Sequence, residues 1–451
     1  MSTARARQIA NISKALGSRQ LLWTGTRGDD ARSLSDIPQF SGSFTIINRY
    51  SRHPLQNTVA YEDLTKRRVD LDSWDIDEHL YDDATTQYRQ ALLGALSADS
   101  TVISYRPSHF VSALIFARQN KCFDLGLFAD QQRAFEHKPW VESAVVRLGI
   151  PTLGWKYLAD EDQMDADKIL ANGPVVVRPS RGSGGSGMAI IHSADELKSQ
   201  WPSGQEFFVS ISPYCGGCLP LNVGAVVWDE TVTIHHLSVQ LIGVPYCVSL
   251  PFGYCGNDFD LPKSLEKSII EQIELITVRL GDWLRSGGYR GAYGVDFLLD
   301  GGKVVFTEIN ARFQGSTRLS CLLSVNNDEP CLLLDHIAAL LHLQPSISIS
   351  LMDKMKGAAP ASHIVIHNTS DGSSKINTHS LSSSFRKLDR SRRIEVQVGA
   401  DTICDPGAIM ACTTINRSVT HDGYSLHHDI ENVIASALSD QCTTEVDAEE
   451  T

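Results

Sequence analysis

Residues 308–312 read Glu308-Ile309-Asn310-Ala311-Arg312, with polar side chains at every second position. Glu308 and Asn310 are two residues apart on a predicted strand, so their side chains lie on one face. The preceding strand-like run, residues 292–299, contains a single acid, Asp296. Carboxylate and amide oxygens are the ligands that Mg2+ prefers. The pattern predicts a divalent-metal site formed by Asp296, Glu308 and Asn310.

The connection between the two strands decides whether these three ligands meet. The sequence Asp300-Gly301-Gly302 predicts a tight hairpin turn. A two-residue turn at Gly301-Gly302 would pair Asp296 with Thr307 and place its side chain on the opposite face. A three-residue turn centred on Gly301 would pair Asp296 with Phe306, on the same face as the other two ligands. We therefore predict the odd-length turn.

A glycine-rich loop, Gly182-Ser183-Gly184-Gly185-Ser186-Gly187, follows the strand-like run Val175-Val176-Val177-Arg178. Glycine allows backbone N–H groups to approach a phosphate closely. The loop is not a Walker A motif, because Met188 stands where that motif requires lysine and a strand is predicted to follow. A surface turn would explain a lone glycine loop equally well. The basic residues beside it, Arg178 and Arg181, favour a phosphate site.

The order strand, glycine loop, strand and late Asp…Glu-x-Asn-x-Arg resembles the ATP-grasp superfamily of carboxylate–amine ligases. The matching stretches are His137-Lys138-Pro139, VVVRPSRGSGGSGM from Val175, GAYGVDFLLD from Gly291 and FTEINARFQGS from Phe306. The resemblance covers residues 135–325, roughly. In size and arrangement the whole chain also looks like the peptide ligases of the pheganomycin type.

The resemblance implies a role for each of these residues. Lys138 and Arg178 would contact the phosphates of ATP, although the family usually has lysine at the second position. The residues expected to close over the β- and γ-phosphates are Arg181, Gly182, Ser183, Gly184, Gly185, Ser186, Gly187 and Met188. Mg2+, or Mn2+ in its place, would bind Asp296, Glu308 and Asn310. Arg312 matches the residue that holds an acyl phosphate, and the main chain of Ser210 and Ile211 would contact the adenine.

The implied activity is ATP-dependent formation of an amide or peptide bond through an acyl phosphate, with release of ADP and phosphate. The expected partners are a small-molecule carboxylate and an amine, in particular an amino acid or a peptide. His235 and His236 are candidates by type for the base that accepts the amine proton, although we expect exposed strand residues here. One alternative is a regulatory or structural ATP-binding module without chemistry, and a second keeps the chemistry but changes the acceptor, as in carboxylases or phosphotransferases. The intact Glu308, Asn310 and Arg312 argue against the first alternative.

Composition narrows the class of protein further. The chain has 451 residues and a net charge of −13, which argues against a nucleic-acid partner. It contains no run of 18 apolar residues and no secretory h-region, so we expect no membrane partner and a cytoplasmic location. Residues 1–28 lack Asp and Glu, a composition that fits a transit segment or, as we prefer, a packed N-terminal helix. The resemblance also allows a homodimer.

The predicted fold class is α/β, with an ATP-grasp core between an N-terminal open α/β domain and a small C-terminal domain. The expected boundaries are 1–135 for the N-terminal domain, 136–345 for the ATP-grasp region, 346–440 for the C-terminal domain and 441–451 for a disordered acidic tail. Apolar residues at helical spacing predict helices over 268–286 and 332–343 and from Pro139 onward.

The chain has ten cysteines, including one Cys-x-x-Cys pair, Cys215 and Cys218. With Cys247 and Cys255 this pair could form a four-thiolate zinc site, but the spacing differs from the usual paired pattern. We therefore expect free thiols packed near a loop. The basic cluster Arg386, Lys387, Arg390, Arg392 and Arg393 is expected to be a solvated face, or else a contact for an acidic substrate.

Overall fold

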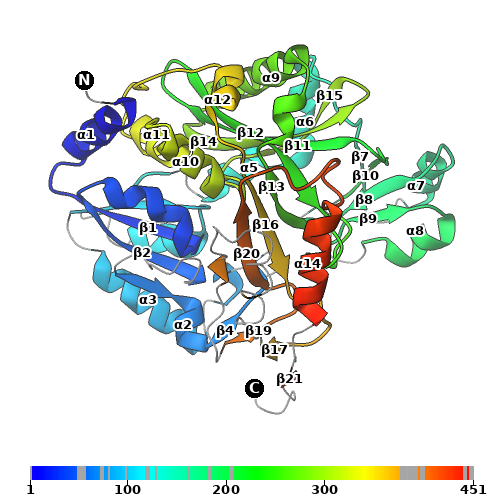
Figure 1. Cartoon of the computed structure of the whole chain (residues 1–451), viewed down its shortest axis with the longest axis horizontal. Helices are drawn as coiled ribbons and strands as arrows, with labels where there is room; N and C mark the ends of the chain where they lie inside the picture. The colour runs from blue at the N-terminus through cyan, green and yellow to red at the C-terminus, as the bar shows by residue number, and fades with distance from the viewer. Residues whose placement is uncertain are drawn as a thin grey trace.

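The structure is a computed structural model that describes residues 3–47, 57–71, 76–79, 82–96, 99–116, 122–126, 129–159, 163–180, 184–202, 208–375, 383, 395–396, 402–439 and 444–445. The predicted basic cluster at 386–393 and most of the predicted acidic tail lie outside these residues. Four sheets organise the described part of the chain (Figure 1).

The N-terminal sheet is parallel, with strand order β3-β2-β1-β5-β6. Its strands are β1 (Gln20–Arg27), β2 (Phe40–Ile47), β3 (Thr58–Ala60), β5 (Ser100–Ser104) and β6 (Cys122–Asp124). The flanking helices are α1 (Ala4–Leu16), η1 (Gly28–Asp36), α2 (Tyr61–Thr65), η2 (Ile76–Glu78), α3 (Asp83–Ala95), α4 (His109–Phe116) and α5 (Ala129–Phe135). Helices cover both faces of a parallel sheet, so the middle strand β1 is apolar and buried over Leu21–Trp23.

The central sheet has eight antiparallel strands in the order β15-β14-β11-β12-β13-β16-β20-β18. They are β11 (Leu219–Val227), β12 (Val232–Ile242), β13 (Tyr254–Asp258), β14 (Gly291–Asp300), β15 (Lys303–Asn310), β16 (Ser362–His367), β18 (Glu395–Val396) and β20 (Ile409–Ile415). The last three strands extend the sheet beyond residue 345, because β16 pairs with β13. The domain boundaries expected from the sequence stay a prediction.

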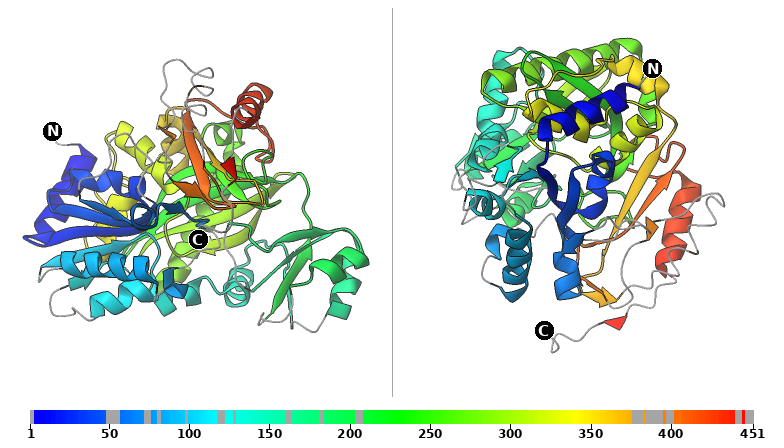
Figure 2. Two further views of the ribbon diagram at one scale, coloured as in Figure 1. Left: turned by 90° about the horizontal axis from the view of Figure 1, so that it is seen from below. Right: turned by 90° about the vertical axis from the view of Figure 1, so that its left-hand side faces the viewer.

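A smaller antiparallel sheet, in the order β7-β10-β8-β9, carries the glycine loop between its last two strands. The strands are β7 (Lys156–Leu158), β8 (Val175–Arg178), β9 (Ala189–Ile191) and β10 (Val209–Pro213), with helices α7 (Gln163–Leu170) and α8 (Ala194–Gln200). The two helices cover one face of this sheet, and the whole unit projects from the body of the molecule (Figures 1 and 2). A fourth, short sheet joins β4 (Arg67–Arg68), β17 (Ser374–Lys375), β19 (Ile403–Cys404) and β21 (Thr444–Glu445).

Helices pack on both faces of the central sheet. The remaining helices are α6 (Lys138–Arg147), η3 (Leu261–Ser264), α9 (Lys267–Ser286), α10 (Thr317–Asn326), α11 (Leu332–Leu340), α12 (Leu351–Gly357) and α14 (His428–Ser439). α9 buries its apolar stripe against Val223, Ala225 and their neighbours, and α11 packs near Val226 on the opposite face. Side chains alternate along a strand. One face of β11 therefore packs in the apolar core against α9, and the other face contacts α11 and carries the polar residues of the site.

The helices expected from the sequence are present with small shifts at their ends. α9 starts one residue earlier than predicted, α11 ends three residues earlier, and α6 begins at Lys138 with Pro139 in its first turn. The N-terminal stretch is a packed helix, as preferred, with Ile12 and Leu16 buried. No helix in the described ranges has the length and apolar character needed to cross a membrane.

Two leucines of α9 test how much its buried stripe stabilises the fold. Leu280 is 0% exposed and Leu275 is 59% exposed. We expect Leu280→Ala to lower the free energy of unfolding by about 2–5 kcal/mol, since the deletion leaves a cavity. Leu275→Ala is the matched control and should change it by less than about 0.5 kcal/mol. Urea denaturation of both variants measures the difference, and equal losses would contradict this account.

Candidate nucleotide and metal site

A cavity of about 380 Å3 lies where the small sheet, the central sheet and the N-terminal sheet meet. The small sheet and its loop contribute Arg178, Gly184, Gly185, Ser186 and Met188. The central sheet contributes Asn222, Gln240, Asp296, Glu308 and Asn310. The carboxyl ends of the parallel strands β1 and β5 also reach the cavity. The residues at these ends that line it are Thr26, Arg27, Tyr105 and Arg106. Ligands of open parallel sheets bind at these strand ends.

The hairpin of β14 and β15 brings the predicted metal ligands together, but by a different route from the one predicted. Its turn has two residues, Gly301 and Gly302, with φ of 51° and 86°, because Asp300 pairs with Lys303. The predicted odd-length turn is therefore wrong. A bulge beside Asp296 inserts one extra residue into β15, so that Asp296 pairs with Glu308. The bulge corrects the register that the turn alone would have spoiled.

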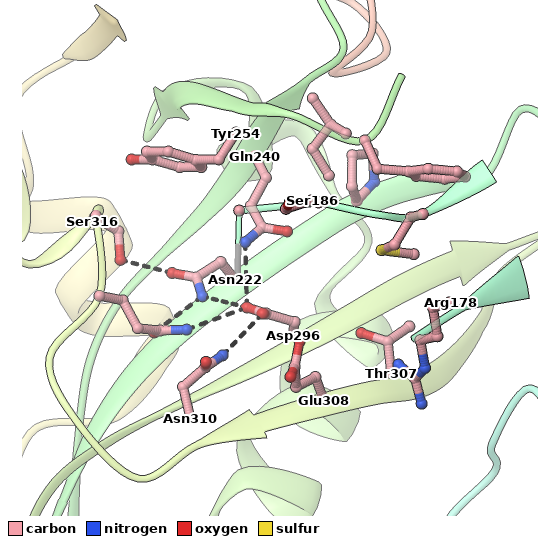
Figure 3. Close-up of a pocket in the computed structure, with 18 of the residues that line it drawn as sticks. Arg178, Ser186, Asn222, Gln240, Tyr254, Asp296, Thr307, Glu308, Asn310 and Ser316 are labelled. Atoms are coloured by element: carbon pink, nitrogen blue, oxygen red, sulfur yellow. Dashed lines mark hydrogen bonds between the residues drawn. The ribbon is translucent and has the colours of Figure 1, made fainter. Parts of the chain in front are cut away.

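Asp296 lies at the centre of a ring of side-chain amides (Figure 3). Its Oδ1 accepts hydrogen bonds from Asn222 Nδ2 at 2.5 Å, Gln240 Nε2 at 3.2 Å and Gln314 Nε2 at 3.3 Å. Its Oδ2 accepts one from Asn310 Nδ2 at 3.0 Å. The ring fixes the carboxylate with neutral donors, none of which cancels its charge.

Burial and the nearby charge of Glu308 raise the pKa of Asp296 to about 6. Lys138 lies near Glu308, with 3.9 Å between Lys138 Nζ and Glu308 Oε1. Asn310 uses its amide nitrogen toward Asp296, and its oxygen accepts no hydrogen bond from the described residues. Two carboxylates and an amide oxygen fit a hard divalent cation, which would offset the repulsion between the two acids.

Arg178 ends β8 on the other side of the cavity and stacks on an aromatic ring. Its guanidinium carbon lies 3.7 Å from the centre of the Trp155 ring. Burial lowers the pKa of Arg178, and the charge of Glu308 opposes that shift. Glu142 holds the segment that carries Trp155, because its carboxylate accepts hydrogen bonds from the Trp155 backbone N–H and the Tyr157 hydroxyl. The cation is thus fixed in place before any phosphate arrives.

The glycine loop lies over the cavity and against a second loop. Gly185 has φ of 83°, and a Cβ there would lie 2.1 Å from the carbonyl oxygen of Phe252. Gly187 has φ of 70°, and its Cβ would lie 2.9 Å from Pro179 Cγ. Both positions therefore require glycine. The predicted phosphate contacts Arg181, Gly182 and Ser183 lie outside the described residues.

Arg312 also faces the cavity and is held from one side. Its Nε lies 3.3 Å from Glu136 Oε1, and its Nη1 donates to the Phe313 carbonyl oxygen at 3.1 Å. Ser210 and Ile211, predicted at the adenine, are buried in β10 and pair with both neighbouring strands. The cavity lining near them consists of Ser212, Pro213, Tyr214 and Cys215.

Two expectations about reactive side chains are wrong. His235 and His236 are buried rather than exposed, because core side chains and helices cover β12 on both faces. His235 Nε2 lies 3.2 Å from Asp335 Oδ2, and burial lowers the pKa of both histidines well below the usual value. Neither lines the cavity. Cys215 and Cys218 are not free thiols but form a disulfide.

The amide ring around Asp296 and the tryptophan stacked on Arg178 were not predicted from the sequence. Asn222 interrupts β11, a strand that is otherwise apolar, whereas Gln240 lies in a strand with several other polar residues. Both side chains point to the face that carries Asp296 (Figure 3). A polar residue inside an apolar strand, such as Asn222 in β11, is the sequence feature that indicates a site residue here. Trp155 and Gln314 stand in loops, where periodicity predicts nothing about direction.

A glycine loop on a small antiparallel sheet, facing an Asp, Glu and Asn hairpin on a larger one, defines the ATP-grasp fold. Residues 150–316 match a family model described as ATP-grasp domain. Carboxyaminoimidazole ribonucleotide synthase from Aspergillus clavatus, solved with ATP, is similar with a TM-score of 0.60 and 15% identity, covering 94% of this chain and 98% of that one. Biotin carboxylase from Campylobacter jejuni has a TM-score of 0.61 and 12% identity, covering 96% and 93%.

Curated sequences point in the same direction. Formate-dependent phosphoribosylglycinamide formyltransferase from Synechococcus sp. (strain CC9311) is 27% identical over 227 residues, 49% of this chain and 54% of the relative. Its counterpart from Salmonella paratyphi B is 30% identical over 176 residues, 38% and 42%. The chain therefore spans about half the length of the curated relatives it matches. Residues 150–316 therefore resemble ATP-grasp domains in sequence, and the chain shares its fold with the solved ATP-grasp enzymes.

Replacing Trp155 tests the role of the stacked ring. We expect Trp155→Leu to weaken ATP binding about 2- to 30-fold, the range of a partly desolvated cation–π contact of about 0.5–2 kcal/mol. Trp155→Phe is the matched control, because it keeps an aromatic face for Arg178. Isothermal titration calorimetry measures the affinity, and melting temperatures identify any unfolding. Wild-type affinity in the Leu variant would contradict the assignment.

The raised pKa of Asp296 predicts pH-dependent metal binding. Below about pH 6 the metal-free carboxyl holds a proton, which a cation must displace, so affinity should fall as the pH drops. Mn2+ binding without nucleotide, followed by electron paramagnetic resonance of the free ion from about pH 8 to about pH 5, measures this effect. Asp296→Asn should bind Mn2+ weakly at every pH. A wild-type affinity that stays constant over this range would rule out Asp296 as a ligand.

Proposed function

We propose that the protein is an ADP-forming ligase that activates a carboxylate as an acyl phosphate and couples it to an amine. The observation that carries the proposal is the cavity itself, in which acids and cations face each other across two sheets. Asp296 and Glu308 stand on one wall, and Arg178, Lys138 and Arg312 surround them. This is the charge pattern that stabilises phosphoryl transfer.

In the proposed reaction, Lys138 and Arg178 bind the phosphates of ATP. Asp296, Glu308 and Asn310 would hold Mg2+, which when bound neutralises charge on the transferring phosphoryl group. A substrate carboxylate oxygen attacks the γ-phosphorus, the bond to the bridging oxygen breaks, and ADP leaves. The amine then attacks the acyl carbon, the C–O bond to the phosphate breaks, and phosphate leaves, with the amine proton passing to solvent.

Arg312 is placed to bind the acyl phosphate. Its planar guanidinium offers paired N–H donors that match phosphate and carboxylate oxygens. Glu136 orients it from behind at 3.3 Å, while the cavity side stays open to a ligand. The interaction of Arg312 with the acyl phosphate would form only after activation. Its binding energy would therefore raise the rate of the chemical step rather than the affinity for ATP.

The far end of the cavity supports an anionic substrate. Arg27 and Arg106 line it at the carboxyl ends of β1 and β5, and both suit a carboxylate or phosphate group. The sequence predicts an amino acid or peptide. The names of the curated relatives favour a second candidate, formate with a phosphorylated ribosyl amine.

A coupled assay of ADP release decides between these candidates. The full chain with Mg2+ and ATP is tested against pairs of carboxylates and amines: amino acids, short peptides, and formate with phosphoribosylglycinamide. The proposal expects ADP release that requires both a carboxylate and an amine, with phosphate released in equal amount. A regulatory ATP-binding module would bind ATP without any pair raising ADP release, and that result would overturn the proposal.

Arg312 provides a direct test of the acyl-phosphate step. We expect Arg312→Ala to bind ATP within about twofold of wild type, while substrate-dependent product formation falls at least about 100-fold. Arg312→Lys keeps the charge but loses the paired geometry, and should recover only part of the rate. Product formation by mass spectrometry and ATP affinity by calorimetry measure the two effects. An unchanged rate in the Ala variant would remove the assigned role.

A further inference from the structure

The segment Cys215-Gly216-Gly217-Cys218 connects the two halves of the nucleotide site. It leaves the small sheet after β10 and enters the central sheet at β11 (Figure 1). Cys215 lines the cavity, and Cys218 is buried. The proposed ligase reaction uses neither sulfur, so the pair needs a separate explanation.

The backbone of this segment is shaped to bring the two sulfurs together. The Cα atoms of Cys215 and Cys218 are 6.0 Å apart, and a disulfide joins them. Gly217 has φ of 79°, a conformation that L side chains rarely adopt, and a Cβ on Gly216 would lie 3.0 Å from the Tyr214 ring. Glycine is therefore favoured at position 217 by its backbone conformation, and a small residue at position 216 by the adjacent Tyr214 ring.

A carboxylate completes the cluster. Leu219 pairs with Leu299 across β11 and β14, and this register places the next residue, Asp300, beside Cys218. The sulfurs of Cys215 and Cys218 and a carboxylate oxygen of Asp300 all lie within 4.8 Å of one another. Asp300 is exposed, and although its backbone pairs with Lys303, its side chain makes no hydrogen bond or ion pair with the described residues. Its position thus follows from strand pairing, not from a partner that holds it.

We propose that reduction of the Cys215–Cys218 disulfide turns this cluster into a binding site for a thiophilic divalent cation, Zn2+ in particular. Two thiolates and a carboxylate are ligands that Zn2+ accepts, and together they leave a fourth tetrahedral position for water. Separations of about 3.5–4 Å between ligand atoms follow from zinc–ligand bonds of about 2.0–2.3 Å, so small side-chain movements suffice.

The chemistry balances with a dithiol as the reductant. The dithiol gives two electrons and two protons to the disulfide, which becomes two thiols, while the dithiol becomes a disulfide. Cation binding then releases both thiol protons to solvent. Oxidation by a disulfide compound reverses the sequence and expels the ion. The site therefore exists only in the reduced protein.

An ion at this position would join two mechanically important parts of the site. Cys215 and Cys218 belong to the connection between the sheets, and Asp300 belongs to the hairpin that carries Asp296 and Glu308. The bound ion would fix the hairpin to the connection on which the small sheet is mounted. The proposed ligase activity is not needed for this inference, because the ion can be measured directly.

The other cysteines of the chain determine the design of the test. The free cysteines among the described residues are all buried: Cys247, Cys255, Cys321, Cys331, Cys404 and Cys412. The side chains of Cys122 and Cys442 lie outside the described part of the chain. The background for the experiment is therefore the full chain carrying Cys122→Ser and Cys442→Ser.

The experiment titrates Co2+ into this background protein after reduction with dithiothreitol and its removal without oxygen. We expect a thiolate-to-cobalt charge-transfer band that saturates at one thiolate-bound ion per chain and that added Zn2+ bleaches. The same protein before reduction should show no band. Absence of the band in the reduced background protein overturns the proposal.

Single substitutions assign the ligands. Cys215→Ser and Cys218→Ser should each abolish or strongly weaken the band, and a band that persists unchanged in either variant overturns the proposal. Asp300→Asn, at an exposed position where misfolding is not expected, should lower the Co2+ affinity about tenfold or more. Asp195→Asn, a change at another exposed acid, is the matched control and should bind like the background protein. Equal affinity of the two aspartate variants removes Asp300 from the site.

Discussion

The site is organised around one half-buried carboxylate, that of Asp296, and the amides that hold it. A charge taken out of water must be hydrogen-bonded, and four neutral donors reach it from three strands and a loop. Their convergence constrains the backbone. Gly294 lacks a side chain because a Cβ there would lie 1.6 Å from Gln314 Oε1. The amide of Gln314 occupies that space and donates to Asp296.

Neutral amides orient the carboxylate of Asp296 without cancelling its charge. The negative charge therefore remains uncompensated until a cation binds. Glu308 adds a second acid beside it, while two of the cations that line the cavity are held by other groups. Arg178 stacks on Trp155, and Arg312 pairs with Glu136. Charges fixed in advance cost no reorganisation when a polyanion and a cation arrive together. This preorganisation explains why so many polar side chains line the floor of an otherwise apolar sheet.

The sequence predicted the features that depend on periodicity and failed where tertiary contacts decide. The apolar stripe of α9 and the placement of Glu308 and Asn310 on one face of β15 follow from spacing alone, and both are present. The burial of His235 did not follow from the sequence of β12, because histidine occurs at both buried and exposed positions and the partner that covers it, Asp335, lies far along the chain. The disulfide of Cys215 and Cys218 depends on the backbone shape of the connection between two sheets.

The hairpin of β14 and β15 shows why a correct site can follow from an incorrect turn. Gly301 and Gly302 favour a two-residue turn, since both adopt positive φ without strain. That turn alone would direct Asp296 away from the cavity. A one-residue bulge shifts every pair beyond it by one position and so returns the acid to the face of Glu308. The bulge therefore compensates for the two-residue turn. The register at Asp296 depends on both features together and does not follow from the turn sequence alone.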